Sequence, residues 1–220
     1  MEEVVIPLDA ERSVSGLWTR PDGATALLVL AHGAGAGMAH KAMTATAEGL
    51  AARGIATLRY NFLYMERGSK RPDSPALAHQ AVRAAIAKAA ELAPDLPLFA
   101  GGRSFGGRMT SQAQAEQPLP RVRGLVFFAF PLHPPGKPGV ERAAHLAKIE
   151  VPMLFLQGTN DEFAQLDLLN DTVAGLRPRV SLTLAEFADH SFHAPAKSGR
   201  KDPEVLAEVL DACVAWMAAN

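Results

Sequence analysis

The sequence predicts an α/β fold in which helices cover both faces of a mostly parallel sheet. After residue 25, short apolar runs alternate with longer segments of helical character, which is the order of βαβ units. Two of the runs, residues 25–31 and 122–130, are apolar almost throughout, as expected for strands covered on both faces. The chain has 220 residues and shows neither an internal repeat nor a linker, so we expect one domain over residues 1–220.

The N-terminal segment adds two shorter strands to this pattern. Residues 4–8 and 14–18 are rich in β-forming side chains and are joined by a polar turn. Pro7 has no N–H to donate to a neighbour, so the first strand is expected at an antiparallel edge of the sheet. Residues 61–73 are expected to form a polar loop. The other expected strands are 55–60, 96–100, 151–156 and 180–184, and the expected helices are 41–53, 74–93, 108–116, 141–148, 163–176 and 202–219.

The junction after the expected strand 96–100 carries the sequence G-R-S-F-G at residues 102–106. Between a strand and a helix, G-x-S-x-G is the nucleophile elbow, a tight turn that holds the serine with its hydroxyl exposed. Glycine is needed at both ends because a β-carbon there would collide with neighbouring elements. The same short motif also occurs in ordinary turns, but the strand before it and the helix after it favour Ser104 as a nucleophile.

A glycine-rich turn, His32 to Gly37, follows the expected strand 25–31. A dinucleotide-binding fingerprint fails on spacing, because Met38 or His40 would occupy the last glycine position. A phosphate-binding G-x-x-x-x-G-K-[ST] motif does not occur. A His-Gly turn can instead present a backbone N–H beside an elbow serine, so we expect an oxyanion loop. His32 is expected to hold this turn by structural hydrogen bonds.

Polar residues follow three of the expected strands, and the carboxyl ends of parallel strands lie at one edge of a sheet. Ser104, Asp161 and His190 each stand directly after such a strand. A serine hydroxyl becomes a good nucleophile when a histidine removes its proton and a carboxylate orients that histidine. The sequence therefore predicts Ser104 as nucleophile, His190 as base and Asp161 as acid.

The acid and the base each have alternatives nearby. Asp161 is also suited to capping the helix that follows it, and Glu162 and Asp167 are the fallback acids. His193 lies on the same loop as His190 and is the lesser candidate for the base.

Composition argues against several classes of partner. The formal net charge is −1, without the basic surplus typical of nucleic-acid binding or a polybasic helix for a membrane surface. No apolar run approaches the roughly 18 residues that span a bilayer, and the acidic N-terminus lacks a signal-peptide pattern, so the expected location is cytoplasmic. The single cysteine, Cys213, is expected in the core. No motif indicates a metal or cofactor, and none specifies an oligomeric state.

These motifs make the chain similar to small α/β hydrolases of the dienelactone-hydrolase-like group. More closely, the chain resembles the hydrolase-like family that includes the testis-expressed protein 30 and KAT8 regulatory complex subunit 3 types. The segments that carry the resemblance span nearly the whole chain, at residues 32–35, 59–62, 102–107, 131–138, 157–161 and 189–192.

The resemblance implies an α/β-hydrolase fold with Ser104, Asp161 and His190 as the catalytic triad. It also implies that the backbone N–H groups of Ala34 and Phe105 are the oxyanion donors. The Asp-His-Ser-Phe motif at residues 189–192 is the family's histidine-containing motif and favours His190 over His193.

Three further residues are expected to contact substrate, namely Gly33, Arg103 and His133. His133 lies in a proline-rich loop, where a role in stiffening the turn is the alternative.

The segment 130–148, where larger hydrolases insert a lid, holds only the proline-rich loop and a short helix. We therefore expect an open site and a hydrolase that cleaves a small soluble ester or thioester, its small-molecule acyl substrate, through an acyl-enzyme. Two alternatives remain, a non-catalytic interaction domain that keeps the fold and an acyltransferase that uses the same triad.

Overall fold

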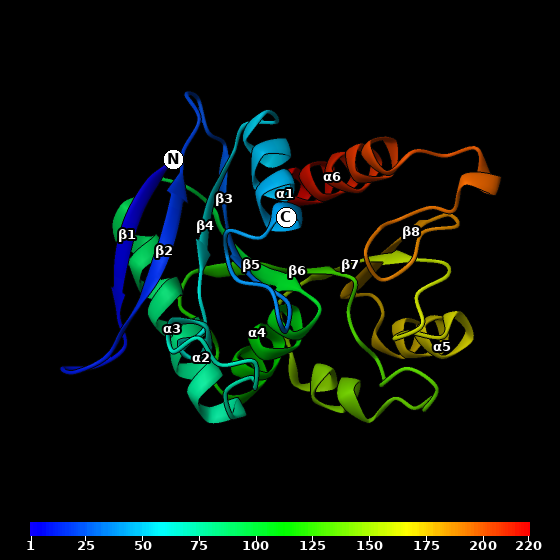
Figure 1. Ribbon diagram of the computed structural model, residues 1–220, viewed down its shortest axis with the longest axis horizontal. Coiled ribbons are helices and arrows are strands. Elements are labelled where there is room, and N and C mark those ends of the chain that lie inside the picture. The colour runs from blue at the N-terminus through cyan, green and yellow to red at the C-terminus, as the bar shows by residue number, and fades with distance from the viewer.

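Eight strands form one sheet in the computed structural model, which describes residues 1–220 (Figure 1). The strands are β1 (Glu2–Pro7), β2 (Ser13–Thr19), β3 (Ala26–Ala31), β4 (Ile55–Tyr60), β5 (Leu98–Arg103), β6 (Val122–Phe128), β7 (Met153–Gly158) and β8 (Val180–Ala185). Their order across the sheet is β1-β2-β4-β3-β5-β6-β7-β8. β2 pairs antiparallel with β1 and with β4, and every other neighbouring pair is parallel. The predicted sheet with an antiparallel N-terminal edge is confirmed, and Pro7 lies in the outermost strand.

Helices cover both faces of the sheet, as the βαβ order predicts. The α-helices are α1 (Lys41–Ala51), α2 (Leu63–Glu66), α3 (Pro75–Leu92), α4 (Phe105–Glu116), α5 (Leu166–Leu176) and α6 (Asp202–Ala219), and the 3₁₀ helices are η1 (Glu141–Lys148) and η2 (Ala196–Ser198). α1 and α6 lie together on one face, whereas α3, α4, α5 and η1 lie on the other (Figure 1). No helix has the length and apolar character needed to cross a membrane.

Each face of the sheet has its own hydrophobic core. Alanines of α3, together with Met109 of α4 and Leu169 of α5, pack in the larger cluster. Met43 of α1 and Val209 of α6 pack in the smaller one, which also contains Cys213. Burial raises the pKa of the Cys213 thiol to about 12, as expected for a core cysteine. Each fully buried aliphatic side chain contributes about 1.5–3 kcal/mol to folding.

The structure differs from the expected elements mainly at the carboxyl edge of the sheet. β5 continues through Gly101 and Gly102 to Arg103, because glycine lets the backbones of β3 and β6 approach closely. α4 begins directly at Phe105 instead of at residue 108. α5 begins at Leu166 instead of at residue 163, because the Asp161 carboxylate accepts the Phe163 N–H in a turn before the helix. A short helix, α2, interrupts the segment predicted as a loop.

Candidate active site

Ser104 occupies a sharp turn between β5 and α4. Its φ of 49° and ψ of −116° are unusual for a residue with a side chain and cost about 1–3 kcal/mol. A β-carbon on Gly102 would lie 2.4 Å from the Ala31 carbonyl oxygen, and one on Gly106 would lie 2.5 Å from the carbonyl oxygen of residue 32. The turn therefore requires both glycines, because the end of β3 packs directly against it.

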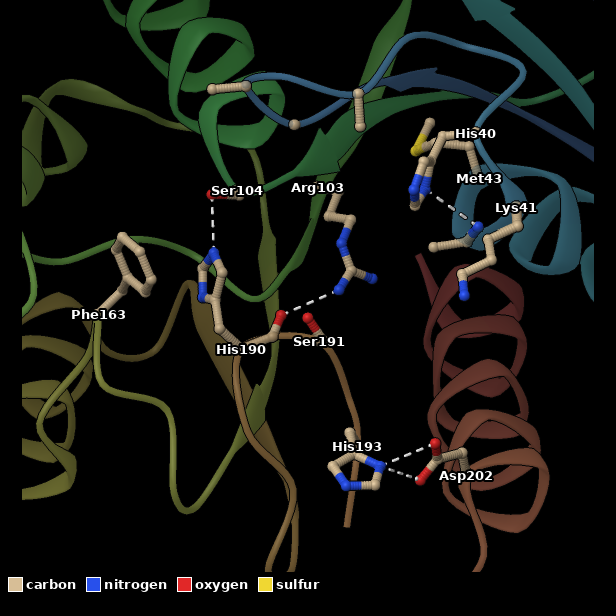
Figure 2. A pocket seen from close by; sticks show the side chains of 14 residues that line it. His40, Lys41, Met43, Arg103, Ser104, Phe163, His190, Ser191, His193 and Asp202 are labelled. Atoms are coloured by element: carbon tan, nitrogen blue, oxygen red, sulfur yellow. Dashed lines mark hydrogen bonds and ion pairs between the residues drawn. The ribbon is translucent and has the colours of Figure 1, made fainter. Parts of the chain in front are cut away.

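The imidazole of His190 joins Ser104 to Asp161. Its Nε2 lies 2.8 Å from Ser104 Oγ, and its Nδ1 lies 2.7 Å from Asp161 Oδ2. Figure 2 shows the first of these contacts on the loop that follows β8. A carboxylate can only accept a hydrogen bond, so Nδ1 donates to Asp161 and Nε2 is left to accept the serine proton. The three residues predicted from their places after β5, β7 and β8 are thus brought together.

Asp161 is held by more donors than His190 alone. Its side chain is 0% exposed, and its Oδ1 accepts the Phe163 N–H at 2.8 Å. Its Oδ2 also accepts a hydrogen bond from Gln157 Nε2, and Gln157 Oε1 in turn accepts the Phe130 N–H at 2.9 Å. These donors compensate for burying a charge. Gln157 was not predicted as a site residue, although an amide near the end of an otherwise apolar strand is a signal for it.

Phe163 is a second residue that sequence reasoning missed. Its ring lies against the His190 imidazole, with centroids 4.2 Å apart and planes inclined by 30° (Figure 2). The His190 side chain remains 18% exposed. Phe163 thus covers one side of the imidazole and restricts its rotation, while the hydrogen-bonding edge stays open to the cavity.

The glycine-rich loop lies beside the elbow, as predicted. A β-carbon on Gly33 would lie only 3.7 Å from Ser104 Cβ. The Ala34 N–H donates to no protein group. Phe105 is the first residue of α4, where backbone N–H groups have no partner within the helix. Two backbone N–H groups without a protein partner thus belong to residues next to the elbow, one on the glycine-rich loop and one at the start of α4.

Four side chains hold this loop in place. Asn61 Oδ1 accepts the Met38 N–H at 2.9 Å, and the buried Arg59 donates to the Met38 carbonyl at 3.0 Å. The Tyr64 hydroxyl accepts the Gly35 N–H at 3.3 Å. His32, the residue after β3, is the fourth, and the other three supports come from β4, the turn after it and α2.

His32 has the structural role expected for it. Its Nδ1 donates to the Gly33 carbonyl at 2.8 Å, and its Nε2 accepts the Phe62 N–H at 3.0 Å. The residue is 0% exposed, and burial lowers the pKa of its imidazole from 6.5 to about 4. His32 is therefore neutral at neutral pH and serves as a fixed link between the loop and the end of β4.

Two cavities meet at Ser104. The first cavity, of about 580 Å³, extends over Arg103 and His190 toward the start of α1 (Figure 2). The second cavity, of about 370 Å³, lies on the side of Phe105 and Arg108. Both volumes fall in the range of small-molecule sites, and Ser104 lines both. The nucleophile is therefore accessible from two directions. The segment from residue 130 to 148 contains only a loop and η1, and it forms no lid over the site.

The residues expected to contact substrate lie in different places. Gly33 and Arg103 line the first cavity. Arg103 also donates to the His190 carbonyl at 3.0 Å and lies over the Phe192 ring at 5.5 Å, so it supports the histidine loop as well. The expectation that His133 contacts substrate is corrected, because this residue is 3% exposed and lines neither cavity.

His133 has the turn-stiffening role that was its alternative. Its Nδ1 donates to the Pro134 carbonyl at 2.9 Å, and its Nε2 accepts the Gln165 N–H at 3.0 Å. Both ring nitrogens are used within the protein, which leaves none for a substrate.

The alternative candidates for the acid and the base form no hydrogen bond with Ser104, His190 or Asp161. His193 pairs with Asp202 at 2.9 Å and has an exposed side chain (Figure 2). This pairing raises the pKa of His193. Glu162 and Asp167 are exposed to solvent. No group of three or more His, Cys, Asp or Glu side chains is arranged to hold a metal ion.

A serine at a strained strand-to-helix turn of such a sheet is the arrangement that defines the α/β hydrolase class. A family described as alpha/beta hydrolase domain matches residues 24–218, and the chain belongs to this family. Membership of this family supports a hydrolase activity in general.

Solved structures share the fold at low sequence identity. An alpha-beta serine hydrolase homologue from Coxiella burnetii is 22% identical, with a TM-score of 0.77 and 96% of each chain covered. Dienelactone hydrolase from Anabaena variabilis is 21% identical, with a TM-score of 0.77, and the match covers 99% of this chain and 96% of that one. A serine hydrolase without a lid from Xanthomonas campestris is 20% identical, with a TM-score of 0.72, and the match covers 98% of this chain and 95% of that one.

Proposed function

We propose that this protein is a serine hydrolase that cleaves an ester or thioester of a small substrate through Ser104, His190 and Asp161. The observation that carries the proposal is the continuous hydrogen-bonded chain from Ser104 Oγ through both ring nitrogens of His190 to a buried carboxylate. A merely structural serine would not need an imidazole aligned by a carboxylate that two further donors hold in place.

The proposed reaction has two steps. Ser104 Oγ attacks the carbonyl carbon of the substrate while its proton moves to His190 Nε2, and the bond to the leaving group breaks as His190 returns that proton to it. A water molecule then attacks the acyl-enzyme, giving its proton to His190, and the acid is released as Ser104 regains its proton. Asp161 stays ionised and stabilises the imidazolium in both steps.

The backbone N–H groups of Ala34 and Phe105 stabilise the negative charge on the carbonyl oxygen in this proposal. Their value lies in being held in place before the reaction, because the loop around Ala34 is fixed at residues 32, 35 and 38. The loss of one such donor typically costs about 100- to 1000-fold in turnover.

Hydrolysis is preferred to acyl transfer because the site is open. Ala34 is exposed, the first cavity reaches solvent, and no lid closes over the acyl-enzyme to exclude water. We further propose that the chain is a relative of the testis-expressed protein 30 and KAT8 regulatory complex subunit 3 types, on the motifs that it shares with them. Some members of that group serve in protein complexes, so the non-catalytic alternative is an outcome of the experiment below.

The experiment is labelling with a fluorophosphonate probe, which reacts with activated serines. We expect wild-type protein to be labelled and Ser104→Ala to be spared. His190→Ala should lower turnover of 4-nitrophenyl acetate by several orders of magnitude, because the triad acts as a unit. Wild-type protein that is neither labelled nor active on esters would favour the non-catalytic alternative.

Ser111 provides a matched control within the same helix. Its Oγ lies 2.7 Å from His145 Nε2, but the hydroxyl donates to the Arg108 carbonyl at 2.9 Å, so the histidine is the donor to the serine. No carboxylate stands behind His145. We expect Ser111→Ala to be labelled like wild type, which shows that a serine–histidine contact alone is insufficient.

A further inference from the structure

Two arginines in the second cavity have neither a hydrogen-bond nor an ion-pair partner in the protein, although one of them, Arg108, lies over the Phe105 ring at 6.0 Å. Arg108 of α4 and Arg142 of η1 both line this cavity together with Ser104. Neither guanidinium group forms an ion pair or donates a hydrogen bond to a protein group. The Nε of Arg108 is fully enclosed and has no acceptor. Leaving a buried donor of a charged group unsatisfied is costly, so these groups are suited to a ligand that brings acceptors.

The positive charges of the two arginines also repel each other. Both are half-buried, and burial together with the nearby charge of Arg142 lowers the pKa of Arg108. Two like charges side by side in a partly enclosed cavity are unfavourable unless an anion lies between them. Arginine presents a planar set of donors that fits a carboxylate or phosphate, which makes this pair a natural anion site.

Other charged groups near the second cavity do not neutralise the pair. Asp73 lines the same cavity, but its Oδ2 accepts the Tyr64 N–H at 3.0 Å and it forms an ion pair with neither arginine. His145, beside Arg108, is neutral because burial lowers the pKa of its imidazole to about 4.

The first cavity differs, because its half-buried guanidinium group is already engaged and its other cation, Lys41, is exposed to solvent. Arg103 donates to the His190 carbonyl, and the His193 charge is paired with Asp202. The second cavity is therefore the place where an anionic part of a substrate would find two half-buried guanidinium groups without an ionic partner.

We infer that Arg108 and Arg142 bind an anionic group of the substrate, a carboxylate or a phosphate, while Ser104 attacks the ester carbonyl beside it. This inference rests on the proposed function and narrows it to small esters or thioesters that carry a negative charge on one side of the scissile bond. The volume of the second cavity, about 370 Å³, suits a short charged chain better than a macromolecule.

The experiment compares esters of similar size in which one substituent is charged or neutral, and the rate of each with hydroxide in solution corrects for the reactivity of the ester itself. On the acyl side, the 4-nitrophenyl monoester of adipic acid is compared with 4-nitrophenyl hexanoate. On the leaving-group side, phenyl acetates with a para carboxylate, a para phosphate or a para methyl ester are compared. Comparing the acyl-side esters with the leaving-group esters shows on which side of the scissile bond the anion binds. Comparing the para carboxylate with the para phosphate shows which of the two anions is preferred.

We expect kcat/KM to favour an anionic ester over its neutral match by roughly 10- to 100-fold, the range of charge-assisted hydrogen bonds. The double variant Arg108→Gln, Arg142→Gln should lose most of this preference, and Arg142→Lys should retain part of it. Arg123→Gln should keep the full preference, because Arg123 is an exposed arginine near the start of β6, at the opposite edge of the sheet. Thermal unfolding of each variant checks that the fold is intact.

Two results would overturn the inference. The first is wild-type protein that cleaves neutral esters well but shows no preference for any anionic match, which leaves the proposed function standing. The second is a preference that survives in the folded double variant. Failure to cleave any ester, with no probe labelling, would instead overturn the proposed hydrolase and the anion site with it.

Discussion

At the scale of single residues, the site depends on buried polar side chains whose hydrogen bonds are nearly all satisfied. Asp161 has donors from Gln157, Phe163 and His190, and both ring nitrogens of His32 are occupied. Each of these groups would be costly to bury alone. The enclosed Nε of Arg108 is one of the few exceptions, and the lack of an ion pair or hydrogen bond at both Arg108 and Arg142 is the reason for assigning this pair a ligand.

The buried neutral histidine at residue 32 predicts a dependence of stability on pH. Burial lowers the pKa of His32 from 6.5 to about 4, so the unfolded chain takes up a proton before the folded protein does. The stabilisation is complete above about pH 6.5 and is lost as the pH falls toward 4. At about pH 5 the loss amounts to about 2 kcal/mol.

The check is denaturant unfolding of wild type and His32→Gln at about pH 7.5 and pH 5. His32→Gln is expected to be less stable at both values, but its free energy of unfolding should fall by about 2 kcal/mol less between them. His145 titrates in both proteins and so cancels in the comparison. An equal fall in the two proteins would contradict the account of His32.

At the scale of elements, the elbow is a contact between backbones. The ends of β3, β5 and the start of α4 approach so closely that no side chain fits at Gly102 or Gly106. This contact places Ser104 beside the glycine-rich loop and leaves the N–H of Phe105 at the helix start. The positions of the two N–H groups that we propose as oxyanion donors therefore depend on how these elements pack.

Gly106→Ala tests this packing. Its β-carbon would lie 2.5 Å from a carbonyl oxygen of β3's continuation, so the backbone must shift. We expect a loss of stability of roughly 1–3 kcal/mol or more, and a larger proportional loss of esterase activity because the elbow moves.

Gly175→Ala is the matched control, since Gly175 is also a helical glycine but has no atom within 4 Å of its β-carbon position. Gly175→Ala should raise the free energy of unfolding by about 0.4–1 kcal/mol. Chemical denaturation measures both changes, and a Gly106→Ala protein as stable and active as wild type would show that the elbow tolerates a side chain.

At the scale of the whole molecule, the helix at the C-terminal end of the chain completes one face of the sheet. α6 packs beside α1, and Leu210 is 1% exposed between them (Figure 1). A β-carbon on Gly49 of α1 would lie 2.3 Å from Leu210 Cδ1. Residues far apart in the chain therefore share one packing site between α1 and α6.

A double-mutant cycle tests this shared site. Leu210→Ala should cost roughly 2–5 kcal/mol of stability, because it leaves a cavity in the core. Gly49→Ala should be unfavourable in wild type, where it displaces Leu210. In the Leu210→Ala background it should instead be favourable by up to about 1 kcal/mol, the usual difference in helix propensity.

Equilibrium unfolding of the two single variants and the double variant gives the coupling energy. An effect of Gly49→Ala that is the same in both backgrounds would show that the two positions do not interact.

The local patterns along the chain were sufficient for the order of elements, the antiparallel edge at Pro7 and the places of Ser104, Asp161 and His190 after their strands. These features depend on nearest neighbours, on apolar runs and on turn chemistry, all of which are written in consecutive residues. Element ends were less well predicted, because distant residues also act there. The N–H of Gln165, the residue before α5, donates to His133 Nε2 from another part of the chain.

The sequence by itself determined the class of fold and the three residues of the candidate catalytic group. Only the tertiary structure decided that Gln157 and Phe163 support them, that His133 is buried outside both cavities, and that Arg108 and Arg142 share a cavity with Ser104. The physical reason is that a side chain's partner, or its lack of one, depends on which distant segments pack against it, and no local pattern records that packing.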